Sequence, residues 1–343
     1  MEQTALDYSV LSKRRNDLFG ISIVSIVIFH YCLLSKFAAA KIYIALVGSV
    51  GVPVFLMLSG MGLFFSMSKN AAIGQFYKKR LVRVVIPYLI VASVHFLVRY
   101  ILIDGKGFID WLRGVFFVDF ITKGNSQFWF IAFILVMYLL FPLFFKLFKS
   151  GKLNFLKLLI LCAMVVAANF ALSKLTPALY KNIEVMLTRT PAFLIGVYLG
   201  EKVYNKRPVQ LPFWLIGVLG GAAFIYIGIM RSVVGEKFSM YIVRYGETIY
   251  ALLLTMVLSI VLEAIHSGGF SKICAFFGGM SLELYMVHVS LRSIMGEIGF
   301  PGSNILYYVI MVVIAIGISF ALQKFDGFAA KKLTAPKAAK SKT

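Results

Sequence analysis

Long runs of apolar residues dominate the chain, and short charged stretches separate them. A run of about 20 apolar residues is long enough to cross a bilayer as a helix. Transmembrane strands would instead show weak alternation over about ten residues. The pattern therefore predicts an all-α integral membrane protein with about ten transmembrane helices. The predicted spans are 17–35, 42–66, 82–103, 126–147, 154–173, 188–202, 211–230, 243–265, 275–295 and 303–323.

Composition supports the same class of protein. Of the 343 residues, 60% are hydrophobic and 14% are charged, whereas soluble domains carry about 25% charged residues. The net charge of +21 does not predict nucleic-acid binding, because the basic residues lie in loops and at helix ends, where they act as topology signals. We expect a cytoplasmic segment over 1–16, a transmembrane domain over 17–323 and a basic, disordered cytoplasmic tail over 324–343.

The orientation follows from two clusters of lysine and arginine, at 13–15 and 78–83. Such clusters stay on the cytoplasmic side, and an even number of spans then returns the C-terminus to that side. The stretch 104–125 is amphipathic, and it either lies in the interface or re-enters the membrane. The three cysteines form no CxxC pair, so neither a metal site nor a disulfide framework is predicted.

Two histidines lie inside predicted spans at matching depth. His30 and His288 each lie 13 residues into their helix, which corresponds to roughly 20 Å. An ionisable group at this depth costs several kcal/mol unless it faces protein or water. These histidines either hydrogen-bond between helices or handle protons. His95 and His266 lie nearer to helix ends and are interpreted as structural.

Several charged residues also lie at or inside the spans. Arg80 and Arg83 share a helix face, and they either anchor the cytoplasmic end or hold phosphate groups. Arg189 lies at the outer start of the sixth span, and Glu283 lies inside the ninth. An ion pair with a residue of opposite charge would satisfy each of them. Glu247, near the outer start of the eighth span, is interpreted as an interfacial, snorkelling residue.

The second span contains the sequence Ser59-Gly60-Met61-Gly62. The two glycines allow a neighbouring helix or a ligand to approach the backbone closely. Ser59 is not predicted to be a nucleophile, because the chain has no GxSxG elbow. Trp129 opens the fourth span, where an aromatic belt would place it in any case.

Six segments together resemble the acyltransferase 3 family of multi-pass membrane acyltransferases, which modify surface polysaccharides and related acceptors. Their order and spacing are similar to the family pattern from about residue 14 to 322. The segments are RNDLFGISIVSIVIFH, VPVFLMLSG, FYKKRLVRVVIPY, QFWFIAFILVMYLLFPLF, RTPAFLIGVYLG and MSLELYMVH.

The resemblance implies ten helices in the plasma membrane with both termini inside. It also implies an acyl-CoA donor, usually acetyl-CoA, that is offered from the cytoplasm, and an acceptor on the outer side. His30 matches the histidine regarded as catalytic in the family, and Arg80 matches the third-helix arginine, with Arg83 following. The other matching positions are Trp129, Arg189 and, in the last segment, Tyr285 and His288.

One position departs from the family pattern. The family commonly has an arginine eleven positions before the catalytic histidine, and here that position is Phe19. Arg15, one turn closer to the cytoplasm, either takes over this role or is a plain inner anchor. The acceptor is expected to be a cell-surface or lipid-linked glycan. Some family members carry a fused outer domain, so this chain is expected to act alone or with a separate extracytoplasmic partner.

These residues support a hypothesis of O-acyl transfer without a permanently bound cofactor. His30 would act as general base on an acceptor hydroxyl, and a carboxylate from Glu283 or Asp17 would orient it. Arg15, together with the third-helix arginines, would hold the phosphates of coenzyme A, and a long apolar cavity would take its pantetheine arm. The rival is a proton-coupled transporter or flippase, for which intramembrane ionisable residues are equally suitable. A catalytically inactive scaffold is a third alternative, suggested by Phe19.

Overall fold

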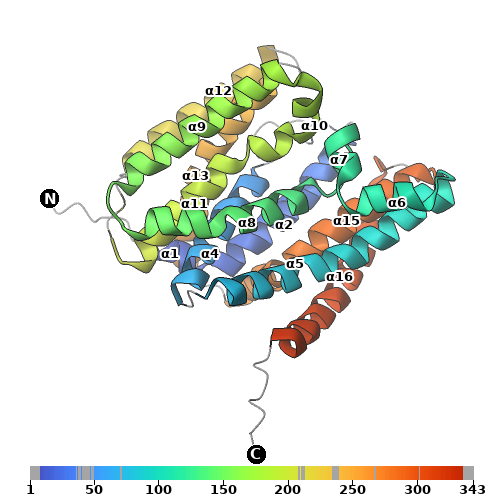
Figure 1. Ribbon diagram of the computed structural model, residues 1–343. Helices are drawn as coiled ribbons and strands as arrows, with labels where there is room; N and C mark the ends of the chain where they lie inside the picture. Colours follow the sequence, from blue (N-terminus) through green and yellow to red (C-terminus); the bar gives the residue numbers. More distant parts are fainter. Residues whose placement is uncertain are drawn as a thin grey trace, which may run out of the picture.

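The fold is all-helical throughout the part of the chain that the computed structural model describes (Figure 1). The described residues are 8–35, 37, 40, 47, 50–69, 72–207, 209, 213–233, 239–265, 268–300 and 302–334. The helices are α1 (Ser9–Lys13), α2 (Arg15–Cys32), α4 (Gly51–Lys69), α5 (Ile73–Phe96) with its π-helical continuation η1 (Leu97–Ile103), α6 (Phe108–Val115), α7 (Val118–Lys123), α8 (Trp129–Lys149), α9 (Asn154–Leu175), α10 (Pro177–Leu187), α11 (Thr190–Tyr204), α12 (Phe213–Val233), α13 (Ser239–Ile265), α14 (Gly268–Gly279), α15 (Ser281–Glu297) and α16 (Ile305–Thr334).

The prediction of an all-α membrane protein is confirmed, and the predicted number of spans is approximate. Among the described residues, seven helical stretches are long and apolar enough to cross a membrane, or eight if the bent pair α14–α15 is one span. Helices α2 and α12 coincide with the two remaining predicted spans. The location of both termini in the cytoplasm stays a prediction.

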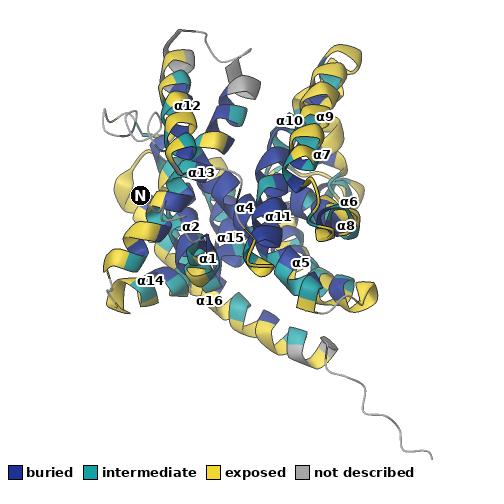
Figure 2. Ribbon diagram, turned by 90° about the vertical axis from the view of Figure 1, so that its left-hand side faces the viewer, coloured by how far each residue is buried: buried dark blue, intermediate teal, exposed yellow. Residues whose placement is uncertain are grey.

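Several predicted boundaries differ from the observed helices. The ninth predicted span is two helices that meet at 65°, where the pair Gly278-Gly279 weakens the helix before α15. The sixth span is longer than predicted, because α10 precedes α11 and the two together run from Pro177 to Tyr204. Helix α16 continues to Thr334, so the first part of the predicted disordered tail is helical and projects from the bundle (Figures 1 and 2).

The core of the bundle lies around α4, α11 and α15, which carry mostly buried residues (Figure 2). Small residues bring α4 and α11 into close contact. A Cβ added at Gly60 would collide with the backbone of Phe193, and one added at Gly196 would collide with the backbone of Met57. Glycines let membrane helices pack backbone to backbone, so the predicted close approach at Gly60 is confirmed, with a helix as the neighbour.

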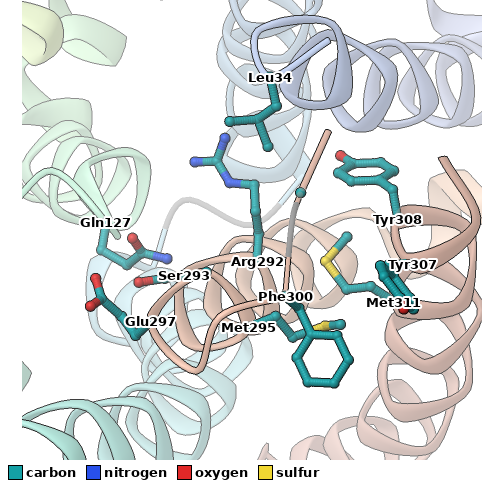
Figure 3. A pocket seen from close by; sticks show the side chains of 12 residues that line it. Leu34, Gln127, Arg292, Ser293, Met295, Glu297, Phe300, Tyr307, Tyr308 and Met311 are labelled. Atoms are coloured by element: carbon teal, nitrogen blue, oxygen red, sulfur yellow. The ribbon is translucent and has the colours of Figure 1, made fainter. Parts of the chain in front are cut away.

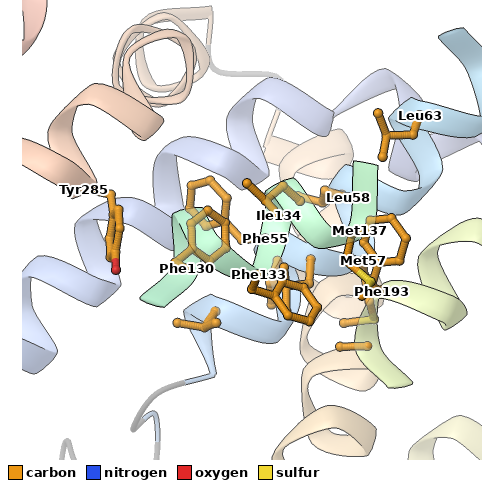
Figure 4. Packing of buried hydrophobic residues seen from close by; sticks show 14 of the residues in the cluster. Phe55, Met57, Leu58, Leu63, Phe130, Phe133, Ile134, Met137, Phe193 and Tyr285 are labelled. Carbon is orange, nitrogen blue, oxygen red and sulfur yellow. The ribbon is translucent and has the colours of Figure 1, made fainter. Parts of the chain in front are cut away.

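Aromatic rings continue this core toward α15 (Figure 4). The ring centroids of Phe55 and Phe130 are 6.1 Å apart, and those of Phe130 and Tyr285 are 5.3 Å apart. One turn further along α8, Phe133 lies edge-on to Phe193, with ring centroids 6.4 Å apart. Such edge-to-face pairs are favourable beyond the area they bury, and they hold α15 in place against α4 and α8.

Polar contacts fix the end of α1 and the beginning of α2 to the helices that follow α12. Lys13 and Arg14 form ion pairs with Glu263 of α13. Ser271 of α14 donates a hydrogen bond of 2.9 Å to the Asp17 carboxylate. Helices α2 and α14 also pack closely through glycines. These contacts together hold α2 at a fixed angle in the bundle.

The amphipathic stretch 104–125 forms the two short helices α6, which lies beside α5, and α7, which packs against α6 and α10 (Figure 1). Asp119 of α7 is buried and ties this segment together. Its carboxylate accepts hydrogen bonds from Tyr100 and Arg113, each at 3.1 Å, and forms an ion pair with Lys123 at 3.2 Å. The two short helices thus form one unit with the end of the α5–η1 stretch.

Candidate active site

The two predicted membrane histidines are in direct contact. Nδ1 of His30 lies 2.8 Å from Nε2 of His288, and the ring centroids are 5.0 Å apart. His288 is completely buried, whereas His30 is half-buried. The two histidines that were predicted to lie at the same depth therefore contact each other, one from α2 and the other from α15.

A second hydrogen bond determines which nitrogen of each neutral ring carries the proton. Nδ1 of His288 lies 2.7 Å from the carbonyl oxygen of Leu284, one turn earlier in α15. A carbonyl only accepts, so this nitrogen of His288 must be the donor, and its Nε2 then has a lone pair. Nε2 of His288 in turn requires a donor, which is Nδ1–H of His30. The remaining nitrogen of His30, Nε2, is therefore unprotonated and able to accept a proton.

Aromatic and amide groups surround this pair. The ring of Tyr285 lies edge-on to His288, with centroids 6.1 Å apart. The Tyr285 hydroxyl lies 3.5 Å from the carbonyl oxygen of Gln127, and the Gln127 side chain donates to the carbonyl of Val289. Trp129, in the next turn of α8, is half-buried and packs against the core. The structure thus brings Tyr285 close to the histidines, whereas no described contact joins Trp129 to them.

The carboxylate that was expected to orient His30 lies elsewhere, so this part of the hypothesis is wrong. Glu283 and Asp326 lie side by side, with Arg83 close enough to interact with both. Asp17 contacts Ser271 and Arg14 at the beginning of α2. The partner of His30 is another imidazole, and a backbone carbonyl orients that imidazole in turn.

Three arginines gather near the opposite end of α2 from His30. Arg15 interacts electrostatically with Arg80 and Arg83 of α5, and the hydroxyl of Tyr138 lies near all three. Arg80 is half-buried, and its Nε has no hydrogen-bond partner among the described residues. Like charges repel, so such a cluster is stabilised when an anion binds between them.

Arg15 is not a plain anchor at the membrane surface. Its guanidinium lies over the ring of Phe19, 4.9 Å from the centroid, and its Nε donates to the carbonyl of Leu58 at 3.1 Å. A Cβ on Gly62 would collide with this guanidinium. The absence of a side chain at Gly62 therefore makes room for Arg15, and Arg15 reaches the interior from one turn before the usual position.

Arg189 forms the ion pair that the sequence suggested. Its partner is Glu247, so the interpretation of Glu247 as an interfacial residue is wrong. Nη1 of Arg189 lies 3.0 Å from the carboxylate of Glu247, and both side chains are only 3% exposed. Glu247 is therefore not an interfacial, snorkelling residue. A second pair, Arg244 with Glu184, lies next to the first, and Arg244 also interacts with Glu247. These buried charges connect α10, α11 and α13, far in sequence from the histidine pair.

Sequence reasoning missed one cation near the histidines. Arg292 lies one turn after His288 on α15 and interacts electrostatically with both histidines. The spacing of four residues on one helix was the available signal, because it predicts a shared face. His95 is buried, and its ring accepts from or donates to the hydroxyl of Ser290 at 2.9 Å, in keeping with a structural role. His266 lies outside the described residues.

Three cavities lie beside α2 or the residues that follow it, one against α4, α13 and α14 and two against α15 and α16. One, of about 380 Å³, contains Arg292 (Figure 3). Two apolar cavities, of about 500 and 290 Å³, share Val24, Ile28 and Phe277 in their walls. The walls of these two apolar cavities contain none of the three clustered arginines, so neither is the predicted path between the arginines and His30.

The fold and these sites define a multi-pass membrane protein with a buried histidine pair at one end of the bundle and an arginine cluster toward the other. The chain belongs to the acyltransferase 3 family, because the family model described as an acyltransferase domain matches residues 20–324. It is therefore a membrane acyltransferase by family. No curated protein and no solved structure matches the chain.

Proposed function

We propose that the protein transfers an acyl group, typically acetyl, from cytoplasmic acyl-CoA to a hydroxyl group on a cell-surface or lipid-linked glycan. The observation that carries this proposal is the hydrogen-bonded series from Leu284 through His288 to His30. It leaves the outer nitrogen of His30 ready to accept a proton, which is what a general base for an alcohol needs.

In the reaction, the acceptor hydroxyl oxygen attacks the thioester carbonyl carbon. The new C–O bond forms, the C–S bond breaks, and His30 passes the hydroxyl proton to the thiolate of coenzyme A. His288 stabilises the imidazolium of His30 by accepting its Nδ1–H, in the way that an orienting group supports a catalytic histidine. Both protons and charges are then balanced without a metal ion or a bound cofactor.

The donor would enter at the arginine cluster. Arg15, Arg80 and Arg83 offer guanidinium groups that suit phosphates, and positive-inside topology puts this end of the bundle in the cytoplasm. Fifteen residues of α2 separate Arg15 from His30, which corresponds to about 22 Å of helix. The donor must therefore extend through the bundle, so that its phosphates stay at one end while the thioester reaches the histidines.

The test is acyl transfer by purified protein in lipid nanodiscs, measured both as thiol release from acetyl-CoA and as label in the acceptor. His30→Gln should lose activity by about 10²- to 10⁴-fold, the range for a general base. His95→Gln is the matched control, since His95 is also a buried membrane histidine but not part of the pair. Wild-type activity in folded His30→Gln protein would overturn the proposal, and solute movement without thiol release would favour a transporter.

A further inference from the structure

The cavity that contains Arg292 lies where α15 and α16 meet the end of α2 (Figure 3). Its volume of about 380 Å³ is within the range of small-molecule sites. Polar side chains from Gln127, Ser293 and Glu297 line one side, and aromatic rings, including Phe300 and Tyr307, line the other. This mixture suits a small hydroxylated molecule, because its hydroxyls need hydrogen bonds and its carbon skeleton packs on rings.

The position of Arg292 connects this cavity to the histidine pair. Four residues, or about 6 Å of helix, separate Arg292 from His288 on one face of α15. Arg292 interacts electrostatically with His30 on α2 and with Tyr308 on α16. A molecule that contacts Arg292 in the cavity is therefore next to the histidines.

Arg292 has no acidic partner of its own within the described part of the chain. Glu297, the carboxylate in the cavity wall, forms an ion pair with Arg99 at 2.9 Å instead. A half-buried guanidinium without a counter-ion, aimed into a cavity (Figure 3), is unfavourable until an anion arrives. The planar fork of arginine is suited to bind phosphate with two hydrogen bonds.

We propose that this cavity binds the acceptor, and that Arg292 determines its class by holding a phosphate group next to the hydroxyl that is acylated. This inference rests on the proposed function and deepens it. The phosphate belongs either to the lipid anchor of a lipid-linked glycan or to a polyol or sugar phosphate unit of a cell-surface glycan, and the chemistry that Arg292 recognises is the same for both. The acyl transfer itself is unchanged: the acceptor hydroxyl gains the acyl group and coenzyme A leaves as the free thiol.

The experiment compares charged acceptors with their neutral counterparts. Wild-type protein in phosphatidylcholine nanodiscs receives acetyl-CoA with either glycerol 3-phosphate or glycerol, and a parallel sample contains phosphatidylglycerol as the only hydroxylated lipid. We expect a higher kcat/KM for the phosphate-bearing acceptor. Transfer to phosphatidylglycerol but not to glycerol 3-phosphate identifies a lipid phosphate as the source, and transfer to glycerol 3-phosphate identifies a polyol phosphate as the source.

Variants at Arg292 make the test specific. Arg292→Gln should raise KM for the phosphate-bearing acceptor about ten- to a hundredfold, as expected for lost charge-assisted hydrogen bonds. Arg292→Lys should recover part of this loss, because lysine keeps the charge but not the fork. Lys181→Gln removes an exposed cation outside the cavity and should leave all kinetic constants at wild-type values.

Binding without turnover separates the two proposals. Glycerol 3-phosphate, but not glycerol, should raise the unfolding temperature of the wild-type protein in nanodiscs, and Arg292→Gln should abolish this effect. Equal KM values for charged and neutral acceptors, with both changed equally by Arg292→Gln, would overturn the phosphate site and leave acyl transfer intact. Phosphate-dependent stabilisation without thiol release from acetyl-CoA, whichever acceptor is present, would instead overturn the proposed function.

Discussion

His288 contacts His30 through Nε2, at 2.8 Å, while its own Nδ1 is held 2.7 Å from the Leu284 carbonyl oxygen. The burial of His288 and the fixed carbonyl together leave the pair one arrangement of protons when both rings are neutral. In the proposed mechanism, His288 would have the orienting role that a carboxylate has in many catalytic sites.

This relationship predicts different results for two substitutions of His288. His288→Phe removes the acceptor for the Nδ1–H of His30 and should lower kcat about ten- to a hundredfold, since a misplaced tautomer impairs a general base. His288→Gln should lose less, because the amide oxygen can accept the same hydrogen bond. Steady-state thiol release measures both. Equal losses in the two variants would show that His288 only fills space.

A glycine in α4 tests the role of Arg15. Gly62→Ala should displace the guanidinium of Arg15, because the new Cβ would occupy its place. We expect KM for acyl-CoA to rise about tenfold, the typical value of a lost charge-assisted contact. Helix stability should not fall, since alanine favours helix over glycine by about 1 kcal/mol.

The matched control for that variant is Gly74→Ala, in the first turn of α5. No atom lies within 4 Å of a Cβ added there, so both KM and stability should stay close to wild type. If Gly62→Ala binds acyl-CoA as well as Gly74→Ala does, Arg15 is not part of the donor site.

Sequence reasoning found the elements of the site better than the partners within it. The depths of His30 and His288 follow from counting along two apolar helices, and counting is reliable because the helix rise is fixed. Which faces of the two helices meet depends on their rotation in the bundle, which residue counting does not determine. The pairing of the two imidazoles therefore needed the fold.

The wrong carboxylate has a similar cause. Glu283 lies five residues before His288, and five residues turn the helix by about 140°, so the two side chains point in different directions. Glu283 accordingly lies beside Asp326, whereas Arg292, four residues after His288, returns to the histidine face. The interpretation of Glu247 was wrong because its position in the sequence does not reveal which neighbouring helix covers it. In the structure, Arg189 covers Glu247 and pairs with it.

Removing one partner of the buried pair Arg189–Glu247 should lower the free energy of unfolding strongly, whereas replacing both partners with apolar residues should lower it little. Glu247→Gln leaves a buried guanidinium without its counter-charge and should lower the free energy of unfolding by about 3–5 kcal/mol. The double variant Arg189→Met/Glu247→Leu should recover most of this loss, because it removes both charges. Reversible unfolding in mixed micelles measures the series.

Glu263→Gln is the control for that series, since Glu263 also forms ion pairs but is partly exposed. It should cost much less stability than Glu247→Gln, because an exposed ion pair contributes little. The double variant also tests the predicted substrate role of Arg189: stability that returns without acyl transfer supports that role. A Glu247→Gln protein as stable as Glu263→Gln would contradict the structural account of the pair.

The α6–α7 unit should lose stability in acid because of Asp119. Burial opposes ionisation of this carboxyl, but hydrogen bonds from Arg113, Lys123 and Tyr100 outweigh it and hold its pKa below the usual value. A lowered pKa in the folded state stabilises above the unfolded pKa of about 3.9, and the benefit disappears as pH falls through the folded pKa. The protection factors of the α7 amides, which remove the pH dependence of intrinsic exchange, should therefore stay constant from pH 7 to 5 and fall below pH of about 4.

Asp119→Asn should cause the same loss of stability in the α6–α7 unit already at neutral pH. The variant keeps the shape of the side chain but not its charge, so the opening free energy of α7 should fall by about 1–3 kcal/mol at pH 7. Asp110→Asn is the control, because Asp110 is an exposed partner of Lys123 at 3.9 Å, and its loss should cost less than about 1 kcal/mol. If hydrogen exchange is equally fast in both variants, then the buried carboxylate does not hold α7 in place, and the packing of its apolar residues must do so.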